Sequence, residues 1–379
     1  MTQSPRKIVL IIGNGFDLDL GRKTMYKDFW ESEYCPKHYP APLIYHLNQR
    51  WSETLEAVRW YDLETELLNY YKGIKDPENG VDFMTDEERA FLNKYDSYRV
   101  GFGQYEDKMS TIQSLVNKGV LVYYNSLVPD ILDEYKKDCQ HSPIWRDQKA
   151  LQLINEGLCK YLASISEVET TNSTIALKVL MAANLAREEG SDLAIYNFNY
   201  TPLPVDYGNG FMDIVHYVHG SCTNGGIIIG TRDDAVFNEN YDFLQKSFDK
   251  HYNPPTLVTD LLEADDVIIF GHSLGENDRQ YFKAFFMQQV NYSNPKRKAI
   301  TIFTKNDASE VAVKRSLQKM TEYNLAALYG LNMVKIYKTD DIYSFPEPFR
   351  VFLQKYISDS RYTTAAMNAL YQSAESRAL

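Results

Sequence analysis

The chain lacks most of the features that mark a metal, disulfide or membrane protein. It has only four cysteines in 379 residues, and no pair of them has the spacing of zinc ligands or of a redox motif: Cys35, Cys139, Cys159 and Cys222. We therefore expect reduced thiols and no metal site. No apolar run approaches the roughly 20 residues of a membrane span, and the run at 8–12 is too short for a signal peptide. These absences predict a soluble, cytoplasmic protein without a membrane partner.

Basic residues are outnumbered by acidic ones. The sequence has 40 Lys and Arg residues against 51 Asp and Glu residues, a formal net charge of −11, and no long Lys/Arg run. This balance argues against nucleic acid as the main partner. Apolar residues, in contrast, are abundant, at 44% of the chain with 13% aromatics, which is enough for a sizeable core. The length allows two or three domains, or one α/β domain with a large insertion.

The most informative segment is 7–21, KIVLIIGNGFDLDLG. Its apolar run predicts a buried strand, Gly13 and Gly15 a tight turn, and Asp17 the first turn of a helix. A strand that passes through glycines into a helix N-terminus suits a nucleotide phosphate. The next glycine, Gly21, does not fit the G-x-G-x-x-G spacing of dehydrogenases. A sheet whose first turn simply needs glycine would give the same pattern, and Asp17 is either a cap or faces a ribose hydroxyl.

The pattern of the chain changes near residue 190. Residues 31–190 show helical periodicity, with a capping box at Thr85 and Glu88, and Gly190 is a suitable residue to end the last helix. Beyond it, short apolar runs lie at 193–198, 214–218, 226–229, 266–270, 299–304 and 333–337, with helical segments at about 256–264, 276–290 and 308–329, the last ended by Gly330.

Strands that alternate with helices predict an α/β, Rossmann-like fold with a mostly parallel sheet. The first strand belongs to that sheet but lies far away in sequence. We therefore expect a core of residues 1–30 and 191–345, a large α-helical insertion over 31–190, and a C-terminal helical tail over 346–379.

In open parallel sheets, ligands bind outside the carboxyl ends of the strands. The polar residues at those ends are Asn14, Asp17, Asn197, Asn199, His219, Ser221, Asp233, His272 and Ser273. Each one alone is more readily explained as a turn former or a structural residue. Gathered at one sheet edge, they predict a pocket.

Residues 267–275, VIIFGHSLG, have the Gly-x-Ser-x-Gly pattern of an α/β-hydrolase nucleophile elbow. In that fold the histidine follows the serine along the chain, but none of the seven histidines follows Ser273. Acidic residues, Glu276 and Asp278, also stand where the helix under the elbow needs small side chains. The sequence therefore disfavours a lipase or an esterase.

Six short motifs follow one another along the chain. They are Ile-Gly-Asn-Gly-Phe-Asp at 12–17, Tyr26-Lys27-Asp28-Phe29, Trp60-x-Asp62-x-Glu64, Asn197-Phe198-Asn199-Tyr200-Thr201, His216-x-x-His219-Gly220 and Gly271-His272-Ser273-Leu274-x-x-x-Asp278. Together, from residue 8 to about 340, they resemble the bacteriophage abortive infection AbiH family. The resemblance implies antiviral defence and a phage-derived trigger. The AbiH family in turn resembles, distantly, the sirtuin-type NAD-binding fold.

The sirtuin resemblance extends to individual residues. The sirtuin loop Gly-Ala-Gly-x-Ser-x-x-x-Gly has the spacing of residues 13–21, and the sirtuin His-Gly pair corresponds to His219-Gly220. The Gly-x-Ser strand end corresponds to 271–273. Two positions depart from the pattern: Asp17 stands where a serine is usual, and Thr201 where an aspartate is usual. The zinc module of protein deacetylases is absent, so peptide deacylation is not expected.

The resemblance implies hydrolysis of the nicotinamide–ribose bond of NAD or a related nucleotide, with no tightly bound cofactor. His219 would be the general base and Asn199 would hold the ribose or the attacking water. Asp278 or Asp62 would stabilise the developing cation. The implied nucleotide contacts are Gly13, Asn14, Gly15, Phe16, Asp17, Gly21, Gly271, His272, Ser273 and Asp278.

Other hypotheses stay open. Asp17 and Thr201 favour a non-catalytic nucleotide- or phage-sensing module, and His219 alone would also fit a strand-end imidazole bonded to nearby backbone. A toxin acting on RNA is disfavoured by the acidic charge. The helical insertion would serve as a lid, a trigger sensor or the interface of a homo-oligomer.

Overall fold

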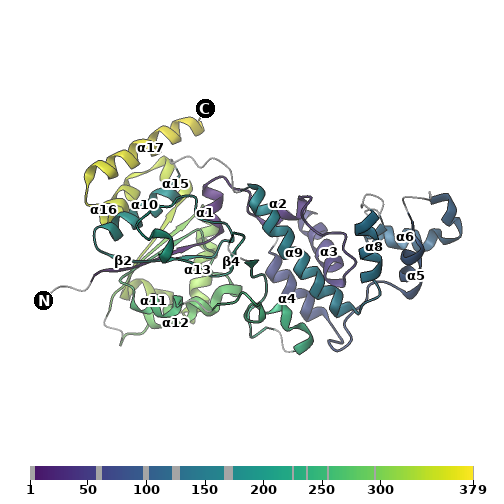
Figure 1. Ribbon diagram of the computed structural model, residues 1–379. Coiled ribbons are helices and arrows are strands. Elements are labelled where there is room, and N and C mark those ends of the chain that lie inside the picture. Colours follow the sequence, from purple (N-terminus) through teal and green to yellow (C-terminus); the bar gives the residue numbers. More distant parts are fainter. Residues whose placement is uncertain are drawn as a thin grey trace. The chain divides into compact units, whose positions relative to one another are not determined.

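The chain folds into two compact units (Figure 1). The computed structural model describes residues 5–56, 62–96, 102–121, 129–165, 174–223, 226–235, 238–253, 256–293 and 296–378. The first unit comprises 1–25, 162–227 and 253–379, and the second comprises 26–161 and 228–252. Within the described ranges, none of the helices has the length and apolar character needed to span a membrane.

A six-stranded parallel sheet forms the centre of the first unit (Figure 1). Its strands, in spatial order, are β3 (Val215–Tyr217), β2 (Asp192–Asn197), β1 (Lys7–Ile12), β6 (Asp266–Phe270), β7 (Ala299–Thr304) and β8 (Met333–Lys338). All neighbouring pairs are parallel. This is the doubly wound Rossmann order, in which the direction of strand addition reverses between β1 and β6. The predicted α/β, Rossmann-like fold is confirmed.

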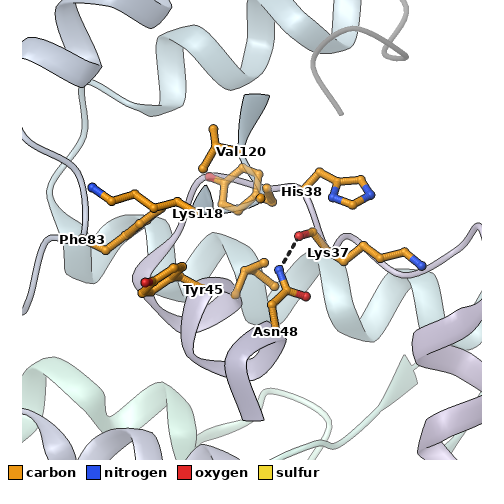
Figure 2. Close-up of a pocket in the computed structure, with 10 residues that line it drawn as sticks. Lys37, His38, Tyr45, Asn48, Phe83, Lys118 and Val120 are labelled. Atoms are coloured by element: carbon orange, nitrogen blue, oxygen red, sulfur yellow. Dashed lines mark hydrogen bonds between the residues drawn. The ribbon is translucent and has the colours of Figure 1, made fainter. Parts of the chain in front are cut away.

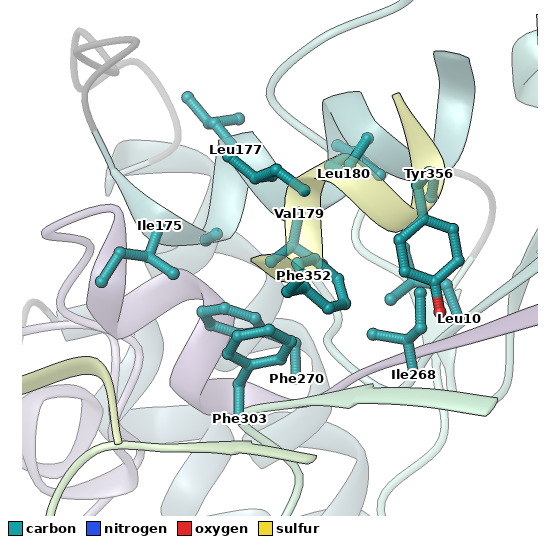
Figure 3. Close-up of a cluster of buried hydrophobic side chains, with 14 of the residues drawn as sticks. Leu10, Ile175, Leu177, Val179, Leu180, Ile268, Phe270, Phe303, Phe352 and Tyr356 are labelled. Carbon is teal, nitrogen blue, oxygen red and sulfur yellow. The ribbon is translucent and has the colours of Figure 1, made fainter. Parts of the chain in front are cut away.

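Successive residues of β1 point to opposite faces of this sheet. One face is covered by α10 (Ile175–Glu188), α15 (Thr339–Ser344), α16 (Glu347–Tyr356) and α17 (Ser360–Ala378), and Figure 3 shows Phe270 and Phe303 of the strands facing Phe352 of α16. The other face is covered by α11 (Leu257–Glu263), α12 (Arg279–Gln289), α13 (Asp307–Met320) and α14 (Leu325–Leu331). The central strands are buried on both faces, which explains their nearly continuous apolar runs.

Two predicted elements differ from the structure. The run at 226–229 does not join the large sheet, because β5 (Gly226–Ile227) pairs antiparallel with the nearby β4 (Gly220–Ser221). An apolar run indicates a buried strand but not its partner. The helix predicted over 308–329 is instead the two helices α13 and α14, because Glu322 and Tyr323 have positive φ, 49° and 66°, which no α-helix can contain.

The predicted helix ends were partly right. The hydroxyl of Thr174 caps α10 by accepting from the amide of Leu177, and Gly190 follows that helix with a φ of 99°. A positive φ suits glycine at this position. Gly330 lies in the last turn of α14, one residue before its end at Leu331.

The second unit is helical. It contains α2 (Tyr26–Glu31), α3 (Pro42–Glu56), α4 (Leu63–Gly73), α5 (Asp86–Lys94), α6 (Met109–Asn117), α8 (Pro129–Asp138) and α9 (Pro143–Ile165). The predicted Thr85–Glu88 capping box is present at the start of α5. The segment 228–252 also belongs to this unit, where the buried Lys246 forms an ion pair of 3.1 Å with Glu64.

A fully buried carboxyl, Asp147 of α9, links α9 to α3 and α4 by hydrogen bonds. It accepts hydrogen bonds from the amide of Leu43, at 2.8 Å, and from the hydroxyl of Tyr70. Asp147 thus accepts a hydrogen bond from an amide in the first turn of α3, where amides have no acceptor within the helix. Burial raises the pKa of Asp147 to about 7, against the opposing effect of its two hydrogen bonds.

We expect Asp147 to make the protein less stable as pH rises. The folded state keeps the Asp147 proton up to about pH 7, whereas the unfolded chain releases it near pH 4. The unfolded state therefore binds fewer protons in between, and stability falls by on the order of 2 kcal/mol from pH 5 to 7.5. Urea unfolding of wild type and Asp147→Asn at both pH values measures this. The variant should lose less stability, and equal pH slopes would contradict the assignment.

Candidate functional site

The loops that follow β1 and β6 contact each other through their backbones. The amide of Gly13 donates to the carbonyl of Phe270, and the amide of Gly15 donates to the carbonyl of Gly271, both at 2.9 Å. A Cβ built on Gly15 would lie 2.6 Å from the Gly271 Cα, and one on Gly271 would lie 2.5 Å from Gly15. Gly271 also has a φ of 65°. These glycines therefore permit a close contact between two loops.

This contact uses the backbone donors that the sequence suggested for a phosphate. The amides of Gly13 and Gly15 are bonded as above, and the amide of Phe16 donates to the Gly13 carbonyl at 2.8 Å. The ring of Phe16 is buried in the core, edge-on to Phe270 at 5.7 Å. The loop thus has an internal structural role, whatever it binds.

The two departures from the sirtuin pattern meet in the structure. The Thr201 hydroxyl donates to Asp17 Oδ2 at 2.5 Å, and Arg22 Nη1 lies 2.8 Å from Asp17 Oδ1. The side chains of Asp17 and Arg22 are 2% and 3% exposed. Burial raises the pKa of Asp17, and Arg22 and Thr201 oppose that shift. Asp17 is therefore a buried structural carboxyl in α1 (Asn14–Asp19).

Three other predicted contact residues are Asn14, which begins α1, Gly21, which follows α1, and Ser273, which follows β6. Asn14 Oδ1 accepts the hydroxyl of Thr24 at 2.5 Å. Gly21 is exposed with a φ of 84°, and a Cβ there would have no neighbour within 4 Å. Ser273 is exposed, and its carbonyl accepts the hydroxyl of Ser316 at 3.3 Å.

Asn199 joins the end of β2 to the glycine loop. Its amide donates to Asn197 Oδ1 at 2.9 Å, and its Nδ2 donates to the Gly13 carbonyl at 3.1 Å. Asn197 Nδ2 in turn donates to the Thr201 carbonyl at 3.1 Å. Both asparagines are buried, so they hold the carboxyl ends of β1 and β2 in a fixed relation.

A carboxylate between two imidazoles lies at the same edge. His219 follows β3, His272 follows β6, and Asp278 directly precedes α12. His219 Nε2 lies 2.9 Å from Asp278 Oδ1, and His272 Nε2 lies 3.3 Å from Asp278 Oδ2. The ring of Phe198 packs against both imidazoles, at centroid distances of 5.3 and 4.4 Å. Both histidines are buried.

The structure therefore brings part of the predicted site together. The glycine loop contacts Asn199 and the loop that carries His272, and Asp278 joins His272 to His219. In the described ranges, no group of three or more His, Cys, Asp or Glu residues is arranged to hold a metal ion. The carboxylate oxygens of Asp278 face the two imidazoles instead.

The other polar residues predicted at strand ends have local partners. The hydroxyl of the buried Ser221 lies 2.9 Å from the Thr223 hydroxyl. Asp233 belongs to the second unit, where it accepts the amide of Ser247 at 3.4 Å. Asp62 also lies in the second unit and caps α4. Trp60, the first residue of its motif, lies outside the described residues.

The sequence did not single out Arg22. It lies five residues after Asp17, and residues five apart do not share a helix face, so their spacing carries no signal. Only the presence of a basic residue soon after an unexplained acidic one could have suggested the pair.

A small pocket in the second unit is lined by aromatic rings and lysine side chains, unlike the histidine and carboxylate edge described above (Figure 2). The rings of Tyr45 and Phe83 stack there at 4.9 Å. The ammonium of Lys118 binds Glu88 at 2.7 Å and that of Lys37 donates to the Trp30 carbonyl at 3.0 Å. None of the predicted site residues lines this pocket.

The comparison with known protein families gives one match. The family model described as "Bacteriophage abortive infection AbiH" matches residues 9–301, which include every candidate site residue. No curated protein and no solved structure matches the chain.

Proposed function

This chain belongs to the bacteriophage abortive infection AbiH family and thus has a role in phage abortive infection, and we propose that it acts there as a nucleotide hydrolase. The substrate would be NAD or a related nucleotide, and the bond cleaved would be the one between nicotinamide and ribose. Among the site's features, the pairing of His219 with Asp278, at the sheet edge that also carries Asn199, supports this proposal most strongly.

The proposed reaction needs a general base close to the ribose carbon that loses nicotinamide. As the C–N bond breaks, its electron pair leaves with nicotinamide and positive charge grows on the ribose. Water then attacks the ribose carbon, and its proton passes to His219. Asp278 would stabilise the imidazolium that forms, as the carboxylate of a catalytic triad does. Asn199 would orient the water or a ribose hydroxyl through its amide.

Nicotinamide release from NAD by the purified full chain tests this proposal. We expect His219→Ala to lower the rate by about 10²- to 10⁴-fold, the usual contribution of a general base. Asn199→Ala should also lower it. His216→Ala is the matched control, because His216 lies three residues earlier, is exposed and stacks on Tyr196 at 4.9 Å. It should retain the wild-type rate.

Release that is unchanged in both His219→Ala and Asn199→Ala would reject these residues as the machinery. A defence effector can remain silent until infection, so the assay is repeated with lysate from phage-infected cells. Neither release nor binding under both conditions would reject NAD as the ligand.

A second candidate is a nucleotide-sensing module without chemistry. The two departures from the sirtuin pattern, Asp17 and Thr201, favour it, because they replace the usual serine and aspartate and bond to each other. In this case NAD would stabilise the fold without being cleaved, by about 2.7 kcal/mol at a hundred times its Kd. A thermal shift with NAD, measured beside the release assay, separates the two candidates.

A further inference from the structure

The hydrogen bonds of His272 fix which of its ring nitrogens carries the proton. The amide of Leu274 donates to His272 Nδ1 at 3.0 Å, so Nδ1 must be the acceptor. In the neutral ring the proton is then on Nε2, which faces Asp278 Oδ2 at 3.3 Å. The nitrogen of neutral His272 that carries the proton therefore faces Asp278.

The backbone at Leu274 is held in an unusual conformation that makes this bond. Leu274 has a φ of 53°, which is uncommon for a residue with a branched side chain. Its side chain is buried in the core cluster on the side of the sheet that α11 to α14 cover, which holds the backbone in place. Such a conformation is maintained only where the surrounding structure determines it, and it often occurs at functional sites.

Asp278 also departs from the usual behaviour of its position. It stands at the N-cap of α12, where an aspartate normally accepts hydrogen bonds from the first amides of the helix. Here the side chain makes no such bond. Its two oxygens face His219 and His272 instead. The position thus offers Asp278 two alternatives, the helix amides or the histidines.

We propose that His272 is a positioning residue, which holds the Asp278 carboxylate away from α12 and thereby keeps His219 in the tautomer with its proton on Nε2. The catalytic meaning of this inference rests on the proposed function, but the tautomer can be measured without a substrate. When the N–H group of His272 no longer faces Asp278, the carboxylate turns to cap α12 and moves away from His219 Nε2.

Two substitutions separate the donor of His272 from its acceptor. In His272→Gln, the amide nitrogen reaches the place of Nε2 and keeps an N–H group facing Asp278. In His272→Asn, the shorter side chain can accept from Leu274 but does not reach Asp278. Nitrogen NMR of the histidine-labelled full chain at neutral pH reports the tautomer of His219, with His219→Ala used to assign its signals. Thermal melting confirms that each variant is folded.

We expect His219 to keep its Nε2–H tautomer in His272→Gln and to lose it in His272→Asn, where its two nitrogen signals move toward an average. The same result in both variants, or the reverse order, would overturn the proposal. The wild-type spectrum gives a second test that needs no variant. The proposal requires that His272 carry its own proton on Nε2. A His272 proton on Nδ1 would overturn the proposal. Absence of nicotinamide release would reject the proposed function but would not change these signals.

Discussion

Gly15→Ala is expected to destabilise the protein by about 3 kcal/mol, near the upper end of the usual cost of overpacking. The new Cβ would lie 2.6 Å from the Cα of Gly271. Backbone cannot move aside as the end of a flexible side chain can, so the β1 and β6 loops would have to separate. That separation would also break the bond between the Gly15 amide and the Gly271 carbonyl. Urea unfolding followed by circular dichroism measures the loss.

Gly330→Ala is the control for Gly15→Ala. Gly330 is exposed inside α14, and a Cβ there would have no neighbour within 4 Å. Alanine should be neutral there or stabilising by up to about 1 kcal/mol, because it favours the helix. If Gly15→Ala keeps wild-type stability and only weakens NAD binding, the glycine is present for a ligand, and our explanation by loop contact is wrong.

Arg22→Met is expected to cost about 3–5 kcal/mol, the usual loss when one partner of a buried ion pair is removed. The carboxylate of Asp17 would be left without its cation in a site that is almost fully buried. Since burial raises the pKa of Asp17, the unpaired carboxyl would take up a proton more readily. The loss should therefore be smaller at pH 5 than at pH 8, as measured by urea unfolding at both pH values.

A second substitution in the Arg22→Met background tests the cause of the loss. In Asp17→Asn/Arg22→Met, the asparagine carbonyl can still accept the Thr201 hydroxyl, but no buried charge remains. The double variant should recover most of the lost stability, because the two residues act as one unit. A double variant as unstable as Arg22→Met, or a loss below about 1 kcal/mol in the single variant, would show that the ion pair is not what holds this loop.

The sheet could be predicted from the sequence because buried parallel strands read as apolar runs. The runs at 193–198, 266–270 and 299–304 closely match β2, β6 and β7. The break between α13 and α14 could not be predicted, since no glycine or proline marks the positive φ at Glu322 and Tyr323. The strand that pairs with β5 could not be predicted either, because strand pairing depends on where the chain turns.

The candidate site could be predicted only as a location. The rule that ligands bind at the carboxyl ends of strands led to Asn199, His219 and His272, which the structure places at one sheet edge. The roles of individual residues depend on contacts across the fold. Gly15 is explained by Gly271, which is 256 positions later, and Asp17 by Thr201, so no local pattern could have shown either one.

The most direct test of the central claim is nicotinamide release at saturating NAD by wild type and His219→Ala, with NAD binding measured for both. If His219 is the base, the variant should still bind NAD, and its release should fall by about 10²- to 10⁴-fold, while His216→Ala behaves as wild type. Release by His219→Ala at the wild-type rate, with NAD bound equally well, would contradict the claim that His219 is the base.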